Sequence, residues 1–304
     1  MPAGPRVVGR EIVLGGRAVP VPFPVVTWLS GDACAPEQVT DRTPRHVPPQ
    51  YVAAHTVTGE PHDPPLVAGP PPPSRACSYT VGQTRSSRDA SFDFLVGVDG
   101  IVYQQLDPLR FYSWNISEAN GRAIGIENEQ GPGGALYPGQ LAAFVALVDT
   151  LTRENGMQRQ VPARLVGGVR VPIRGTVARI APPENGATWW GVVGHRNQDA
   201  QHRGPGDPGD VVIQALLDAG YEGFDLDAGE DRVVWAARQR ALGVPATGIP
   251  GRETVAALKR AGRPAGLWVE RPGDPQSAWK APVIAGLATA LGAGLAYAIF
   301  GGKR

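Results

Sequence analysis

Cysteine is almost missing from this sequence of 304 residues, which contains only Cys34 and Cys77. Two cysteines are too few for a fold held together by several disulfides, and they lack the paired spacing of a structural zinc site. The sequence is equally compatible with one disulfide and with two buried thiols.

An excess of charge of either sign is missing as well. Lys plus Arg number 29 and Asp plus Glu number 28, so the net charge is +1. Such a chain has no global field that would attract nucleic acid, and we expect no nucleic-acid partner. Residues 1–16 also lack the apolar core and cleavage site of a signal peptide, so the sequence predicts no standard N-terminal export signal.

Glycine and proline are plentiful, at 40 and 31 residues, and gather in loop-like stretches such as residues 61–73. Residues 1–50 are predicted to be an N-terminal extension. Within it, the alternating run 17–26 contains three prolines, which favours extended structure at a sheet edge because proline is excluded from central strands.

Short β-like runs alternate with helical spacing over residues 51–222. An Asp99-Gly100 pair between two such runs is a strong hairpin signal. We expect an α/β domain with a mixed β-sheet flanked by helices. The expected strands are 51–57, 92–106, 123–129 and 189–195, and the expected helices are 138–155 and 211–219.

A small helical module is predicted over residues 230–262, with helices at 232–241 and 253–261. Across a tight turn, apolar residues of the first helix are expected to face those of the second, namely Val233, Val234, Ala237 and Leu242 against Val255, Leu258 and Ala261. Residues 281–300 then carry no charge. At about 1.5 Å per residue they just span a bilayer core of about 30 Å, so we predict a transmembrane helix. The alternative is an alanine-rich helix buried against the body of the protein.

The sequence contexts of two histidines and one aspartate set them apart. His55 lies in the run VAAHT, His195 ends the run VVGH, and Asp207 stands in GDPG. Taken alone these would be a weak signal, because a single histidine is more often an ordinary core or surface residue.

Together, the ordered motifs HT, DG, IGIE, VVGHR and DPG resemble the type-2 N-acetylmuramoyl-L-alanine amidase family over residues 51–219. This family includes bacteriophage amidase lysozymes and is related to peptidoglycan recognition proteins. The resemblance implies that His55, His195 and Asp207 bind Zn²⁺ and that Glu127, in IGIE, is the general base. Without that role, Glu127 would be a solvated carboxylate at a strand end.

The chemistry of these residue types agrees with the resemblance. Two imidazoles and one carboxylate leave a fourth tetrahedral position for water, as in catalytic zinc sites. Zinc lowers the pKa of bound water to about 7 and polarises a carbonyl. The implied reaction is hydrolysis of the amide bond between N-acetylmuramic acid and L-alanine in peptidoglycan.

Three positions depart from the family's pattern. A lysine often stands two residues before the last ligand, where this chain has Pro205, and we expect Arg203 to donate to the oxyanion instead. A catalytic tyrosine before the DG strand is replaced by Phe92. The Trp-His pair common before IGIE is Trp114-Asn115, so a polar contact to substrate differs.

The helical module resembles, more briefly, a peptidoglycan-binding repeat through Gln239, Leu242-Gly243, Thr247-Gly248-Ile249, Gly251 and Thr254. The alternative is a plain helical hairpin packed on the amidase domain. We expect a phage or prophage lysis enzyme, cytoplasmic until it is released to the cell envelope and anchored through 281–300. Two rival functions are a non-catalytic peptidoglycan binder and a membrane-active effector that carries an amidase fold.

Overall fold

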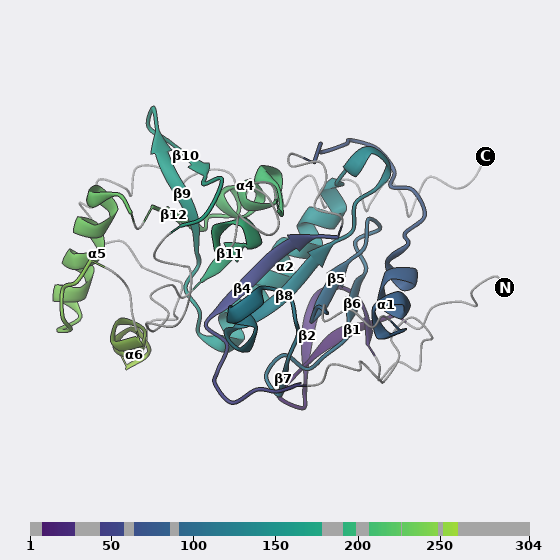
Figure 1. Ribbon diagram of the computed structural model, residues 1–304, viewed down its shortest axis with the longest axis horizontal. Coiled ribbons are helices and arrows are strands. Elements are labelled where there is room, and N and C mark those ends of the chain that lie inside the picture. Colours follow the sequence, from purple (N-terminus) through teal and green to yellow (C-terminus); the bar gives the residue numbers. More distant parts are fainter. Residues whose placement is uncertain are drawn as a thin grey trace, which may run out of the picture.

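The centre of the protein is a seven-stranded mixed sheet with helices on both faces, as the computed structural model in Figure 1 shows. This is the α/β class that the sequence predicts. The structure describes residues 8–27, 43–57, 64–85, 91–177, 191–198, 207–225, 227–248 and 252–260.

The strand order in this sheet is β1-β2-β6-β5-β8-β4-β11. At its centre β8 runs parallel to both β5 and β4, and β11 runs parallel to β4. Parallel strands buried on both faces form near-continuous apolar runs, which explains YVAA and AIGI. The bounds are β1 Gly9–Leu14, β2 Arg17–Thr27, β4 Tyr51–Thr56, β5 Phe94–Val96, β6 Val102–Gln104, β8 Ala123–Asn128 and β11 Val192–Gly194.

The N-terminal strands belong to this same sheet. β2 pairs with β1 on one side and reaches β6 only through Val25, Val26 and Thr27. Pro20, Pro22 and Pro24 precede that contact, so they lie where β2 has a strand neighbour on one side only. The edge character predicted for residues 17–26 therefore applies to the proline-containing half of β2, while β1 forms the outermost strand.

Helices α2 (Pro138–Asn155) and α4 (Asp210–Asp218) cover one face of the sheet. Leu141, Phe144, Leu147, Val148 and Leu151 recur at helical spacing and pack in one apolar cluster with Val52, Ala54, Ile124 and Ile126. Pro138 stands in the first turn of α2, and Gly156 ends it in a left-handed conformation with φ 60°. These signals explain why the predicted bounds of 138–155 agree with the structure.

The opposite face carries Tyr51, Ala53 and His55, and we call it the site face. Helix α1 (Ala76–Arg85) covers one end of it over Leu95 and Tyr103. Helix α5 (Gly229–Ala241) covers the other end, where Trp235 packs with Tyr51 and Val193. Figure 1 shows α1 and α5 at opposite ends of the molecule. Cys77, in α1, is disulfide-bonded, and the only other cysteine, Cys34, lies outside the described residues.

A second, three-stranded sheet in the order β10-β9-β12 was not predicted. Gly167 and Gly168 form its hairpin turn with φ of 57° and 84°, and a glycine pair between two β-like runs is a hairpin signal. The bounds are β9 Gln160–Val166, β10 Val169–Pro172 and β12 Glu222–Phe224, and two short strands, β3 Thr43–Pro44 and β7 Phe111–Tyr112, pair separately.

Gln239 joins α5 both to the segment before helix α6 (Arg252–Arg260) and to α6 itself. Its amide donates to Thr247 Oγ1 at 3.2 Å and Thr254 Oγ1 at 3.0 Å, and its oxygen accepts from Gly248 N at 2.8 Å. Val233 does not face the second helix as predicted, because it is 67% exposed. α5 instead turns Trp235 towards the sheet.

Two arginine–carboxylate pairs fasten α5 to the small sheet, Arg170 with Asp231 and Arg238 with Glu222. The helical module is thus packed on the sheet domain. Among the described residues, none of the helices has the length and apolarity needed to cross a membrane. The transmembrane helix predicted for residues 281–300 lies outside them.

Candidate metal centre

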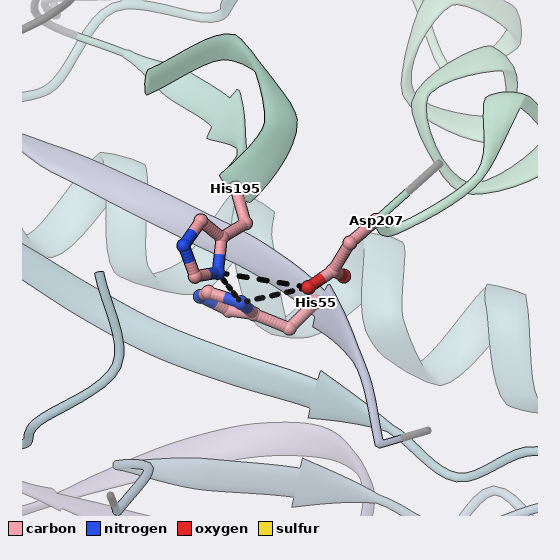
Figure 2. A group of neighbouring side chains, drawn as sticks. All are labelled: His55, His195 and Asp207. Atoms are coloured by element: carbon pink, nitrogen blue, oxygen red, sulfur yellow. Dashed lines mark hydrogen bonds and ion pairs between the residues drawn. The ribbon is translucent and has the colours of Figure 1, made fainter. Parts of the chain in front are cut away.

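His55, His195 and Asp207 converge on one point of the site face (Figure 2). His55 stands near the carboxyl end of β4, and His195 directly follows β11. Because β4 and β11 are neighbouring parallel strands, their carboxyl ends meet at one edge of the sheet. Asp207 comes from the loop before α4. The structure therefore brings together three residues that the sequence singles out across 140 positions and more.

The distances between their side-chain atoms suit a tetrahedral metal ion. His55 Nδ1 lies 3.1 Å from His195 Nδ1, and each of these atoms lies 3.6 Å from Asp207 Oδ2. Ligand atoms on a tetrahedral zinc with bonds of about 2.0 to 2.2 Å are roughly 3.3 to 3.6 Å apart. The two nitrogen–oxygen distances fall in this range and the nitrogen–nitrogen distance is slightly shorter, so the triangle is close to the spacing that zinc requires.

All three side chains are buried, with exposures of 1%, 3% and 1%. Burial alone would raise the pKa of Asp207, but the hydrogen bond from His55 and the charges of the two histidines hold that pKa below its usual value. Asp207 is therefore kept as a carboxylate, the form that binds a cation.

Backbone groups hold Asp207 in place. Thr56 N donates to Asp207 Oδ1 at 2.8 Å, which leaves Oδ2 directed at the histidines. Arg196 N donates to the Asp207 carbonyl at 3.0 Å. Gly194 permits this approach, because a Cβ there would lie 2.7 Å from Pro208 Cδ. The glycine in VVGHR is thus required by the ligand loop that packs against it.

Glu127 lies on β8, directly beside His55 in the parallel register. Residues in register on adjacent strands point to the same face, so Glu127 is directed to the site face, where it is half-buried. Arg203, the predicted oxyanion donor, lies outside the described residues, as does Pro205.

The replaced aromatic and polar positions have structural explanations. Phe92 is buried at 3% exposure in the cluster under α1, with Leu95 and Tyr103, so it serves the core. Asn115 is buried and donates to Ser113 Oγ at 2.6 Å, whereas its neighbour Trp114 is 40% exposed.

Asp93 is a buried acid on the site face that the sequence did not reveal. Its Oδ2 accepts from Gly125 N at 2.7 Å and from Ser113 Oγ at 2.8 Å. Burial raises the pKa of Asp93 to about 6, although the nearby charge of Arg45 opposes this. Asp93 therefore joins the start of β5 to β8 at Gly125, which stands two residues before Glu127.

Arg196, Asn197 and Asp210 were also missed. The guanidinium of Arg196 is completely buried and lies 2.7 Å from Asp210 Oδ1, at the start of α4. Nothing in the sequence marks Arg196 as buried. Its position next to the predicted ligand His195 therefore becomes informative only once the fold is known.

One family and several solved structures resemble the chain. The family described as N-acetylmuramoyl-L-alanine amidase matches residues 45–210. The amidase LysC from Clostridium intestinale URNW is 14% identical, with a TM-score of 0.37 over 64% of this chain and 95% of that chain. The Ph2119 endolysin from the Thermus scotoductus bacteriophage is 16% identical, with a TM-score of 0.34 over 63% and 98%.

A further likeness is the peptidoglycan recognition protein SA of Apis mellifera, which is 13% identical with a TM-score of 0.38, over 65% of this chain and 97% of that chain. No curated protein sequence matches the chain. The structural likenesses are too low to add to the family match, which covers more than half of the 304 residues.

Proposed function

Because the chain belongs to the N-acetylmuramoyl-L-alanine amidase family, we propose that it is a zinc-dependent hydrolase of peptidoglycan. It cuts the amide bond between N-acetylmuramic acid and L-alanine. The observation that supports this most directly is the buried triangle of His55, His195 and Asp207, whose atoms are spaced for a tetrahedral ion. Peptidoglycan is the expected partner.

The side chains that would hold the ion are His55 through Nδ1, His195 through Nδ1 and Asp207 through Oδ2. When bound, zinc would supply Lewis acidity towards the amide carbonyl and lower the pKa of a coordinated water. Burial of all three ligands strengthens every charge interaction at this point, because bulk water does not screen it.

Glu127 is proposed to transfer a proton from the attacking water to the leaving group. Its carboxylate stands beside His55 on the next strand, accepts a proton from the attacking water and returns it to the amide nitrogen of the leaving L-alanine. General acid–base catalysis of this kind contributes about 10² to 10⁴ in rate. Arg203 is proposed to stabilise the oxyanion, so Arg203→Ala should lower kcat while zinc content stays the same.

The test is mass spectrometry of products released from purified peptidoglycan by the wild type, by Glu127→Ala and by a chelator-treated sample. Free stem peptides beginning at L-alanine, lost in both controls, support the amidase. Intact glycopeptides in every sample, from folded protein that contains zinc, would contradict hydrolysis and favour the non-catalytic binder.

A lysis role is the proposed setting. The protein would wait in the cytoplasm and act on the wall after release, with residues 281–300 giving contact to the membrane. Sedimentation of the full chain with lipid vesicles tests that contact, with a chain truncated after residue 279 as the control. Equal recovery of both chains in the supernatant would contradict it.

A further inference from the structure

Two of the three metal-binding side chains lie outside the sheet. His55 is held by β4, which has strand neighbours on both sides. His195 begins the helical segment that directly follows β11, and Asp207 precedes α4. The strand ladders fix His55, so other contacts must hold His195 and Asp207 at their distances from His55 and from each other.

Asn197 is placed to do this for His195. Its Oδ1 accepts from Gly194 N at 3.0 Å, next to His195. Its Nδ2 donates to the carbonyls of Ile173 at 3.0 Å and Gly175 at 3.2 Å, and its own carbonyl accepts from Val177 N at 2.8 Å. We call residues 173–177, which follow β10, the bracing segment.

Asp210 makes the matching connection for Asp207, three residues earlier. Its Oδ1 lies 2.7 Å from the buried guanidinium of Arg196, next to His195. Its Oδ2 lies 2.6 Å from Arg174 NH2 and accepts from Arg174 Nε at 2.8 Å. Since Arg174 belongs to the bracing segment, one carboxylate ties that segment to both ligand loops.

From these contacts we infer that Asn197 and Asp210 are positioning residues, through which the bracing segment holds His195 and Asp207 at metal-binding distance. The inference rests on the proposed zinc site. Groups that orient metal ligands typically change metal affinity by about 10- to 100-fold when they are removed. Neither residue belongs to the group of three side chains that could hold the ion.

The test measures zinc affinity of the full chain by competition with a chromophoric chelator. Asn197→Asp keeps the acceptor for Gly194 N but sets an oxygen against the carbonyls of Ile173 and Gly175. Asp210→Asn keeps the side-chain shape and removes its charge. Glu222→Gln is the matched control, because it removes a similar pairing, with Arg238, on strand β12.

We expect zinc to bind about 10- to 100-fold more weakly to Asn197→Asp and Asp210→Asn, and within about threefold of wild type to Glu222→Gln. The visible spectrum of bound Co²⁺ should change in the first two variants only, since it reports ligand geometry. Their melting temperatures without metal should stay close to that of Glu222→Gln, which separates positioning from general stability.

Wild-type zinc affinity in both variants, or an equal loss in the Glu222→Gln control, would overturn the inference while the proposed zinc site stands. A wild-type chain that binds no zinc would overturn both. If Asn197→Asp does not fold, Asp210→Asn decides the outcome, because its substitution is nearly isosteric.

Discussion

The Nδ1 atoms of His55 and His195 lie 3.1 Å apart at the edge of the central sheet, although 140 residues separate the two histidines in the chain. Their rings meet edge to face at an interplanar angle of 82°. With Asp207 Oδ2 at 3.6 Å from both atoms, two nitrogens and an anionic oxygen surround one point. A metal cation at that point would bind the two nitrogens and the oxygen together.

Zinc should therefore stabilise the folded chain. At a free zinc concentration of about 100 times Kd, the expected gain is about 2.7 kcal/mol, and it should vanish with a chelator. Differential scanning calorimetry with zinc and with chelator measures it. His195→Ala should melt at the same temperature in both conditions, and a zinc-dependent shift in that variant would place the ion elsewhere.

The stability of the protein should also depend on Asp93 through pH. The folded pKa of Asp93, about 6, is raised above the usual value of 3.8, so the native state holds this proton over a pH range in which the unfolded state has lost it. The contribution of Asp93 to the free energy of unfolding is complete below about pH 4 and is lost as pH rises through about 6. About two pKa units correspond to about 3 kcal/mol.

Urea unfolding of wild type and Asp93→Asn without metal, from pH 4 to 7, measures this effect. Asparagine can still accept the bonds from Gly125 and Ser113 but does not titrate. The stability of wild type relative to Asp93→Asn should fall by up to about 3 kcal/mol over this range. A constant difference would contradict the raised pKa.

Gly125, in the IGIE motif, should not accept a side chain. A Cβ there would lie 2.5 Å from Asn115 Cγ, and Asn115 is held by its bond to Ser113. Gly125→Ala should lower the free energy of unfolding by about 1 to 3 kcal/mol. Gly121→Ala is the control, because nothing lies within 4 Å of its added Cβ, and a similar loss there would refute the steric explanation.

Trp235 should contribute to the stability of the whole domain. It is 2% exposed and shares a cluster with Tyr51 and Val193 of the central sheet. Trp235→Ala should cost about 3 to 5 kcal/mol in a single unfolding transition. Val233→Ala, on the exposed side of the same helix, should change stability by less than about 1 kcal/mol. A separate early transition for α5 would show that the module folds on its own.

Local sequence signals predicted much of the central sheet, whereas His55, His195 and Asp207 were singled out by the resemblance of their motifs to the amidase family. Pro138, the helical spacing of the apolar residues and Gly156 each act over a few residues, so the bounds of α2 could be read directly. His55 and His195 follow or end buried β-like runs, which places them at strand ends. Parallel pairing of those strands then brings the two histidines together.

The rest depends on contacts between distant segments. Asp93 is an ordinary aspartate until Ser113 and Gly125 enclose it, 20 and 32 residues away. Asn197 gains its partners from residues 22 to 24 positions earlier. Such partners become known only with the fold. The hairpin β9–β10 is a different case, because Gly167-Gly168 is a local turn signal that the strand predictions left out.

The docking of α5 affects how the protein could reach its substrate. A wall-binding module on a loose tether can search a volume that grows with tether length. Here Trp235, Asp231 and Arg238 join the module to the same body that carries the metal triangle. Anything bound along α5 and α6 would therefore be held at one spacing from the metal triangle. Lengthening the chain before Gly229 should leave that spacing unchanged, because the contacts of Trp235, Asp231 and Arg238 hold α5 in place.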